Sequence, residues 1–160
     1  MEIVVSKAAA EQKSVIRNLL ELYIYDFTEF APEDVNEHGL FEYPYLDHYW
    51  TEEGRHPFLI HVDGKLAGFA LIRELGADER EYSVAEFFVM KKYRRHGVGR
   101  EMAFALFNRL PGQWEVAQME ANVPAQTFWR RIIDEYTKGN YREITRDGWE
   151  GPIQIFRSVP

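Results

Sequence analysis

The sequence of 160 residues predicts an α+β fold, with layers of the α/β type, in which one mixed sheet of about seven strands carries helices on both faces. Three observations support this prediction. Seven short apolar or β-branched runs alternate with polar turns, three longer segments repeat apolar residues at helical spacing, and two Asp-Gly dipeptides join apolar runs, as in hairpins. No linker, repeat or low-complexity tract interrupts this order, so we expect a single domain over residues 1–160.

The N-terminal half predicts a strand, a helix and a hairpin. Residues 2–5 are a strand candidate, and Ser6 could cap the helix after it. Residues 11–27 carry apolar side chains at helical spacing and predict an amphipathic helix. The segment 31–45 is punctuated by proline and glycine and predicts a loop or a short second helix. The apolar runs on either side of Asp63-Gly64, residues 58–62 and 66–73, predict a hairpin.

The C-terminal half adds the remaining strands and helices. A polar connection, residues 76–81, leads into a strand that is rich in β-branched and aromatic residues. A basic glycine turn then opens a helix that extends to about Leu110. The other predicted elements are a strand at 114–119, a helix at 122–136 that begins near Pro124, and a terminal hairpin at 141–145 and 153–156.

Composition and charge exclude several classes of protein. The content of 46% hydrophobic and 15% aromatic residues is too high for a disordered chain, and a net charge of −7 argues against general nucleic-acid binding. The absence of cysteine excludes disulfides and cysteine zinc sites, and His56 and His61, five residues apart on a strand, do not pair as metal ligands. Without a signal-peptide core or an apolar run of roughly 20 residues, a cytoplasmic protein that does not enter the membrane is expected.

The most informative stretch is the strand–turn–helix unit of residues 82–107. Five basic residues surround Gly97 and Gly99, and a helix start leaves backbone N–H groups unpaired, so the turn predicts a site for a phosphate-bearing ligand. An ordinary helix start with a solvated basic face is the alternative. The Walker pattern is absent, and Met102 occupies the third glycine position of the dinucleotide fingerprint, which disfavours a nucleotide-binding regulator.

The pattern Arg94-x-x-Gly97-x-Gly99, after an apolar strand and before a helix, resembles the acetyl-CoA signature of the GNAT N-acetyltransferase superfamily. Asn122-x-x-Ala125-x-x-Phe128-Trp129 resembles the family segment after its fifth strand. The resemblance implies a mostly antiparallel, twisted sheet and a loop whose backbone amides hold the CoA pyrophosphate. It implies that acetyl-CoA is bound by Phe88, Val89, Met90, Arg94, Arg95, His96, Gly97, Val98, Gly99, Arg100 and Asn122. Asn122 could instead simply cap a helix.

The activity that the resemblance implies is transfer of the acetyl group of acetyl-CoA to a primary amine of a small molecule, peptide or protein, by direct attack on the thioester. A backbone N–H near Val89 would polarise the thioester carbonyl. Many family members use a tyrosine as the general acid at the position of Trp129, and an indole N–H does not supply a proton at ordinary pH. Water, Tyr136 or Tyr93 could protonate the thiolate instead. A catalytically weak acyl-CoA-binding or sensor module is therefore a second hypothesis.

Glu86 is the leading candidate for the catalytic base, because it is a carboxylate inside an apolar strand, where burial raises the pKa toward neutrality. Strand alternation predicts that Glu86 shares a face with Val84 and Phe88. The alternative is a carboxylate that pairs with an arginine, caps a helix or is solvated. Glu115 and Glu120, near the fifth strand, are weaker candidates for the base.

Residues 18–54 contain ten acidic and nine aromatic residues and no lysine or arginine. Carboxylates beside aromatic faces suit a cationic amine, and this stretch lies where the GNAT family places its variable substrate-binding segments. The alternative is that the aromatic residues form core and the acidic residues are solvated. The same stretch, or the terminal hairpin, could support a homodimer.

Overall fold

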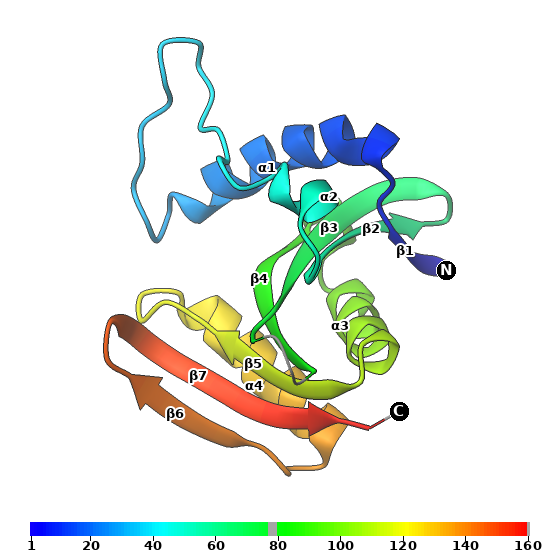
Figure 1. Ribbon diagram of the computed structural model, residues 1–160, viewed down its shortest axis with the longest axis vertical. Coiled ribbons are helices and arrows are strands. Elements are labelled where there is room, and N and C mark those ends of the chain that lie inside the picture. Colours follow the sequence, from blue (N-terminus) through cyan, green and yellow to red (C-terminus); the bar gives the residue numbers. More distant parts are fainter. Residues whose placement is uncertain (77–79, 160) are drawn as a thin grey trace.

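The computed structural model describes residues 1–76 and 80–159, and one seven-stranded sheet with helices on both faces runs through it (Figure 1). The strands are β1 (Ile3–Lys7), β2 (Arg55–Val62), β3 (Lys65–Glu74), β4 (Glu81–Val89), β5 (Gly112–Ala117), β6 (Arg142–Arg146) and β7 (Trp149–Ser158). The α-helices are α1 (Lys13–Phe27), α2 (His48–Thr51), α3 (Val98–Arg109) and α4 (Val123–Thr137). The predicted fold class is confirmed. Among the described residues, no helix is long and apolar enough to cross a membrane.

The strand order is β1-β2-β3-β4-β5-β7-β6, and every neighbouring pair is antiparallel except β4 and β5. The parallel pair is short. It joins Glu81–Ser83 to Gln113–Glu115, and beyond these residues the two strands separate (Figure 1). The C-terminal part of β4 therefore has a strand partner only on its β3 side.

Each face of the sheet has its own apolar core. On one face, α1 contributes Ile16, Leu19 and Leu20, which pack with Tyr49 of α2. On the other, α3 and α4 cover a larger core whose buried residues include Phe107 and Trp114. The predicted hairpin at Asp63-Gly64 is confirmed, and both turn residues have positive φ angles, 49° and 76°. The β6–β7 hairpin and helix α4 are confirmed as well.

One prediction for the N-terminal half was wrong, and one left two alternatives that the structure decides. Ser6 does not cap a helix, because β1 continues to Lys7 and pairs Ser6 with Leu59. A short 3₁₀ turn, Ala10–Gln12, precedes α1. The segment 31–45 is a loop, one of the two predicted alternatives, because proline and glycine interrupt it, and α2 begins later, at His48. Residues 77–79 of the predicted connection 76–81 lie outside the described part.

The long segment between α1 and α2 extends away from the sheet (Figure 1). Glu21 of α1 holds its second half, because the two carboxylate oxygens accept the backbone N–H groups of Phe41 (2.7 Å) and Glu42 (3.0 Å). Several carboxylates of this region thus have structural partners: Asp47 pairs with Lys13, and Glu52 with Arg55.

Candidate functional site

The turn between β4 and α3 presents backbone N–H groups at a helix start. A short 3₁₀ turn, Lys91–Tyr93, follows β4, and the chain then passes through positive φ angles at Arg95 (66°) and Gly97 (77°). The first bond of α3 runs from the Glu101 N–H to the Gly97 carbonyl (3.0 Å). The N–H groups of residues 98–100 therefore precede the helical hydrogen bonds and have the arrangement that suits an anion. A surface pocket bordered by His96, Gly97 and Glu101 adjoins them.

Glycine is needed at the two positions of the turn for different physical reasons. Gly97 requires a left-handed backbone, and a Cβ atom there would meet no atom within 4 Å. Gly99 lies inside α3, where a Cβ atom would approach two ring atoms of Phe128 to 2.9 Å. Gly97 thus shapes the turn and leaves its outer side open, whereas Gly99 lets α4 pack closely against α3.

The arginine side chains of the motif are bound to protein groups. Arg94 donates from Nε to the Val89 carbonyl (2.7 Å) and from Nη2 to Asp26 of α1 (2.8 Å). Arg100 binds Glu135 of α4 through Nε (2.9 Å) and lies 4.4 Å from the Phe104 ring centroid. Arg95 and His96 are exposed at the turn, whereas Val98 is buried and can offer only its backbone. The positive charge at the helix start is therefore partly neutralised by α1 and α4.

The free edge of β4 carries a backbone donor that has no strand partner among the described residues. The Met90 N–H bonds to the Ala67 carbonyl (2.8 Å), and Gly68 is the partner of Val89 in the ladder, so Gly68 and Val89 form a non-hydrogen-bonded pair. In such a pair the N–H and C=O groups point away from the neighbouring strand. Since β5 has already separated, the Val89 N–H points into the gap between β4 and β5, while Arg94 covers the Val89 carbonyl.

Glu86 lies on the α1–α2 face of the sheet, and its predicted neighbourhood needs one correction. The β3–β4 register pairs Leu71 with Glu86 but Ile72 with Val84, so Ala85 is an extra residue in β4. This bulge breaks strict alternation. Val84 packs into the α3–α4 core with Phe87 and Val89, whereas Glu86 shares its face with Ala85 and Phe88.

Three tyrosines from different segments surround Glu86. Tyr23 of α1 packs edge-on against Phe69 and Phe88, with ring centroids 5.6 Å apart in each case, and its hydroxyl is hydrogen-bonded to the Glu86 carboxyl. Burial raises the pKa values of Tyr43 and Tyr49, and the charge of Glu86 raises them further. Burial raises the pKa of Glu86 from 4.5 to about 7, against the opposing effect of the Tyr23 hydrogen bond.

The other candidate bases lie apart from this cluster. Glu115 accepts a hydrogen bond from Arg146 of β6 (2.9 Å), and Glu120 is exposed after β5. The Asn122 side chain accepts the Ala125 N–H (3.1 Å), so it caps α4. Tyr136 donates to Asn108 (2.7 Å) and packs against Phe107, on the α3–α4 side. Within the described residues, no group of three histidine or acidic side chains could hold a metal ion.

Trp129 is 6% exposed and meets the Phe87 ring edge-on at 4.7 Å. We expect Trp129→Phe, which keeps an aromatic ring there, to lower the free energy of unfolding by about 1–2 kcal/mol through lost contacts and to change kcat less than about threefold. Chemical unfolding and steady-state kinetics check the two parts. A rate loss of about 100-fold in a folded variant would show that the indole takes part in the reaction.

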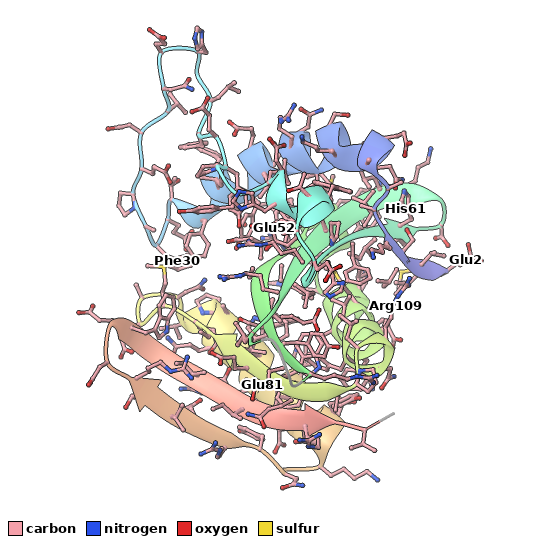
Figure 2. All side chains as sticks on the ribbon, viewed as in Figure 1. Glu2, Phe30, Glu52, His61, Glu81 and Arg109 are labelled. Carbon is pink, nitrogen blue, oxygen red and sulfur yellow. The ribbon has the colours of Figure 1, made fainter. Side chains whose placement is uncertain are left out.

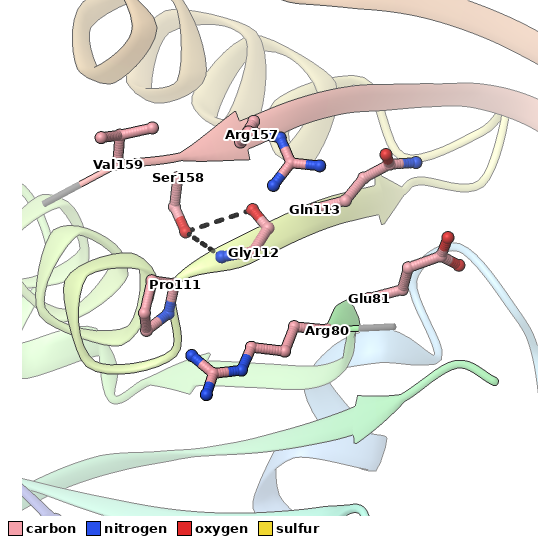
Figure 3. Close-up of a pocket in the computed structure, with 8 residues that line it drawn as sticks. All are labelled: Arg80, Glu81, Pro111, Gly112, Gln113, Arg157, Ser158 and Val159. Carbon is pink, nitrogen blue, oxygen red and sulfur yellow. Dashed lines mark hydrogen bonds between the residues drawn. The ribbon is translucent and has the colours of Figure 1, made fainter. Parts of the chain in front are cut away.

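A second surface pocket lies at the opposite end of β4 and β5, where Arg80, Gln113 and Arg157 are among the lining residues (Figure 3). The Ser158 hydroxyl accepts the Gly112 N–H there (3.0 Å). Because it adjoins Glu81, at the start of β4, this pocket is separate from both the helix start and Glu86.

Sequence reasoning missed the tyrosine cluster. The aromatic richness of residues 18–54 was visible, but α1, the long loop and α2 each contribute one tyrosine to Glu86, and no spacing along the chain identifies them. The role of Arg94 was missed too, since Asp26 is 68 residues away along the chain.

Comparison with known proteins agrees with this architecture. A family model described as the acetyltransferase (GNAT) family matches residues 17–133. An acetyltransferase from Thermus thermophilus superimposes with a TM-score of 0.71 at 12% identity, covering 98% of this chain and 97% of that one. A GNAT-family acetyltransferase from Staphylococcus aureus gives 0.68 at 15% identity, over 99% and 100%. A PaiA N-acetyltransferase from Thermoplasma acidophilum in complex with coenzyme A gives 0.61 at 11% identity, over 96% and 98%. No curated protein sequence matches.

Proposed function

The chain belongs to the GNAT acetyltransferase family, and from this premise we propose that it transfers the acetyl group of acetyl-CoA to a primary amine by direct attack of the amine on the thioester. The observation that carries the proposal is the arrangement on β4. Glu86, with a pKa of about 7, lies three residues before the free Val89 N–H, and the helix start that can hold an anion follows the same strand.

Each part of the arrangement has one task in the reaction. The N–H groups of residues 98–100 hold the pyrophosphate, with Arg95 and His96 at the rim of the turn. The Val89 N–H donates to the thioester oxygen and stabilises the negative charge that develops on it. Glu86 takes a proton from the acceptor ammonium, directly or through one water molecule, which frees the amine lone pair for attack.

The pKa of Glu86 suits this task. At about 7, the carboxylate is half ionised at neutral pH, and it accepts a proton more readily than an ordinary glutamate does. The leaving thiolate takes its proton from water or from a tyrosine. The Tyr136 hydroxyl already donates to Asn108, so Tyr136 is a weaker candidate for the proton donor than water or Tyr93.

The acceptor is a small molecule or a peptide or protein amine. The acidic residues within 18–54 favour an acceptor that is a cation. Three of them, Asp26, Asp47 and Glu52, are already engaged in ion pairs. Tyr23, Tyr43 and Tyr49 offer aromatic rings and hydroxyl groups on the side of Glu86 that this stretch covers.

Measurement of free CoA thiol with a panel of primary amines tests the proposal. We expect at least one amine to raise CoA release about 10-fold or more over the hydrolysis background, and acetyl-CoA, but neither ATP nor NAD, to raise the melting temperature. A module that only binds acyl-CoA is the second candidate, because Trp129 occupies the position where many relatives carry the tyrosine that acts as general acid. Stabilisation by acetyl-CoA without amine-dependent release would favour that module and overturn the enzyme.

A further inference from the structure

Two arginines face each other on the same side of the sheet as Glu86. Arg55 of β2 and Arg73 of β3 are direct cross-strand partners. Arg73 lies two residues after Leu71, which packs into the α1–α2 core and is itself the ladder partner of Glu86. Because side chains two residues apart on a strand share a face, Arg73 and Arg55 lie on the face of Glu86.

The arginine pair lacks full compensation of its charge. Arg55 contacts Glu52 through Nε (2.9 Å), lies 5.5 Å from the Tyr49 ring centroid and keeps 20% of its side chain exposed. Figure 2 shows Glu52 beside α2. Arg73 is exposed and forms no ion pair with any residue in 1–76 or 80–159. Like charges directly opposite each other on neighbouring strands repel, and an anion placed between them would relieve the repulsion.

Tyr43 and Tyr49 lie within electrostatic range of both Arg55 and Glu86. The charge of Glu86 raises the pKa of both tyrosines, and the charge of Arg55 lowers it, so each phenol is within range of both signs. Glu86 itself keeps a pKa of about 7, set by burial and the Tyr23 hydrogen bond, instead of the lowered pKa that a guanidinium partner would cause. Opposite charges are thus held apart on one face of the sheet, unlike a structural ion pair.

One buried hydroxyl close to Arg55 and Tyr43 is poorly hydrogen-bonded. The Tyr49 side chain is 3% exposed, and within the described residues its hydroxyl is buried without a hydrogen bond of good geometry. A buried hydroxyl of this kind costs free energy unless a partner is supplied. A polar group of a ligand bound between Arg55 and Glu86 would supply it.

We propose that Arg55, Arg73 and Tyr49 bind the carboxylate of an acceptor whose amino group faces Glu86, so that the acceptor is an amino acid or a close analogue. The inference rests on the proposed acetyl transfer to an amine and narrows its substrate class. Glu86 and the arginine pair are offset by two residues along the strands, about 6.6 Å, which one small molecule carrying both groups can span. The ammonium provides the cationic end, and the carboxylate matches the arginines.

The test compares amino acids with their amides, which keep the amino group and lose the carboxylate charge. We expect the best free amino acid to have a kcat/KM at least about 10-fold above that of its amide. Arg73→Gln should raise KM for the amino acid about 10-fold or more, change kcat little and leave the amide unaffected. Arg55→Gln should raise KM for the amino acid in the same way. If the Arg55→Gln protein does not fold, Arg73→Gln alone tests the inference, because Arg73 is exposed. Arg157→Gln, an exposed arginine on β7, is the matched control.

Calorimetric titration of amino acids into the CoA-saturated protein tests the same site without turnover. The inference is supported if an amino acid binds and if both Arg73→Gln and amidation of the amino acid weaken its binding. Amides or decarboxylated amines that react better than amino acids, or an Arg73→Gln effect equal for both, would overturn it and leave the acetyltransferase intact. If no amine supports CoA release, the proposed function fails, and the titration alone then decides the carboxylate site.

Discussion

Glu86→Gln should lower kcat/KM for acetyl transfer by about 100-fold or more, because removal of a positioned general base typically costs roughly 10²–10⁴ in rate. In the wild type the activity should rise with pH through an apparent pKa near 7, as Glu86 loses its proton. The variant should lack this limb, and its residual activity should follow only the free-amine fraction of the acceptor. A pH–rate profile of both proteins with one acceptor checks the prediction.

The same substitution should stabilise the protein at alkaline pH. The pKa of Glu86 is raised from 4.5 to about 7 in the folded state, so its protonated form is favoured by folding. That contribution is fully present below pH 4.5 and is lost as the pH rises through 7, up to about 3 kcal/mol. Glutamine cannot ionise, so the melting temperature of the variant should exceed that of the wild type at about pH 8.5 and match it more closely at about pH 4.5.

Two variants distinguish this role from a general loss of charge. Glu115→Gln removes a carboxylate of β5 that binds Arg146 of β6, across the intervening strand β7, and should leave the pH profile unchanged. Tyr23→Phe keeps the ring contacts with Phe69 and Phe88 but removes the hydrogen bond that lowers the pKa of Glu86, so it should move the acidic limb to higher pH. Full activity of Glu86→Gln at every pH would remove Glu86 from the mechanism.

Gly97→Glu should reduce the affinity for acetyl-CoA about 100-fold or more, because it brings a carboxylate to the N–H groups proposed to hold the pyrophosphate, and opposed like charges cost several kcal/mol. The fold should persist, since a side chain at this position meets no atom within 4 Å. Its stability cost is that of an L-residue with a φ of 77°, about 1–2 kcal/mol. Titration of acetyl-CoA followed by calorimetry measures the loss.

Gly64→Glu is the matched control for that variant. Gly64 has a φ of 76° and no atom within 4 Å of a Cβ position, but it lies in the β2–β3 turn. The two variants should lose similar stability, and only Gly97→Glu should lose binding. Gly99→Glu is less informative than the motif suggests, because a side chain there collides with Phe128 and disturbs the packing of α4. Equal affinities for the Gly97→Glu and Gly64→Glu proteins would place the pyrophosphate elsewhere.

Most of the fold could be predicted because each element carries its own signal. Helix α1 has apolar residues at helical spacing, and the β2–β3 hairpin has Asp-Gly between apolar runs. Signals of this kind are local. The bulge at Ala85 has no local sequence signal, because the run from Val84 to Val89 is apolar on both sides of Glu86. Only the pairing with β3 determines which residue is extra. The early separation of β4 from β5 likewise depends on packing between distant segments.

The parts of the candidate site that are close together in the sequence could be predicted, and the parts that only folding brings together could not. The glycine turn and Glu86 lie within 14 residues of each other and were found as a unit. Arg94 was assigned to the ligand by its motif, but in the folded chain it binds Asp26 and the Val89 carbonyl. The tyrosines around Glu86, and the pairing of Arg55 with Arg73, exist only once α1, α2 and three strands are assembled.

The unpaired donor at Val89 has a consequence for how such proteins diverge. A hydrogen-bond donor that belongs to the main chain is supplied by every amino acid except proline, so the side chain at this position is free to change without loss of the donor. The strand edge that exposes it depends on the geometry of β4 and β5, which many different sequences can form. Chemistry held in the backbone therefore survives sequence drift that would erase a catalytic side chain, and a structure detects it where a comparison of residue identities does not.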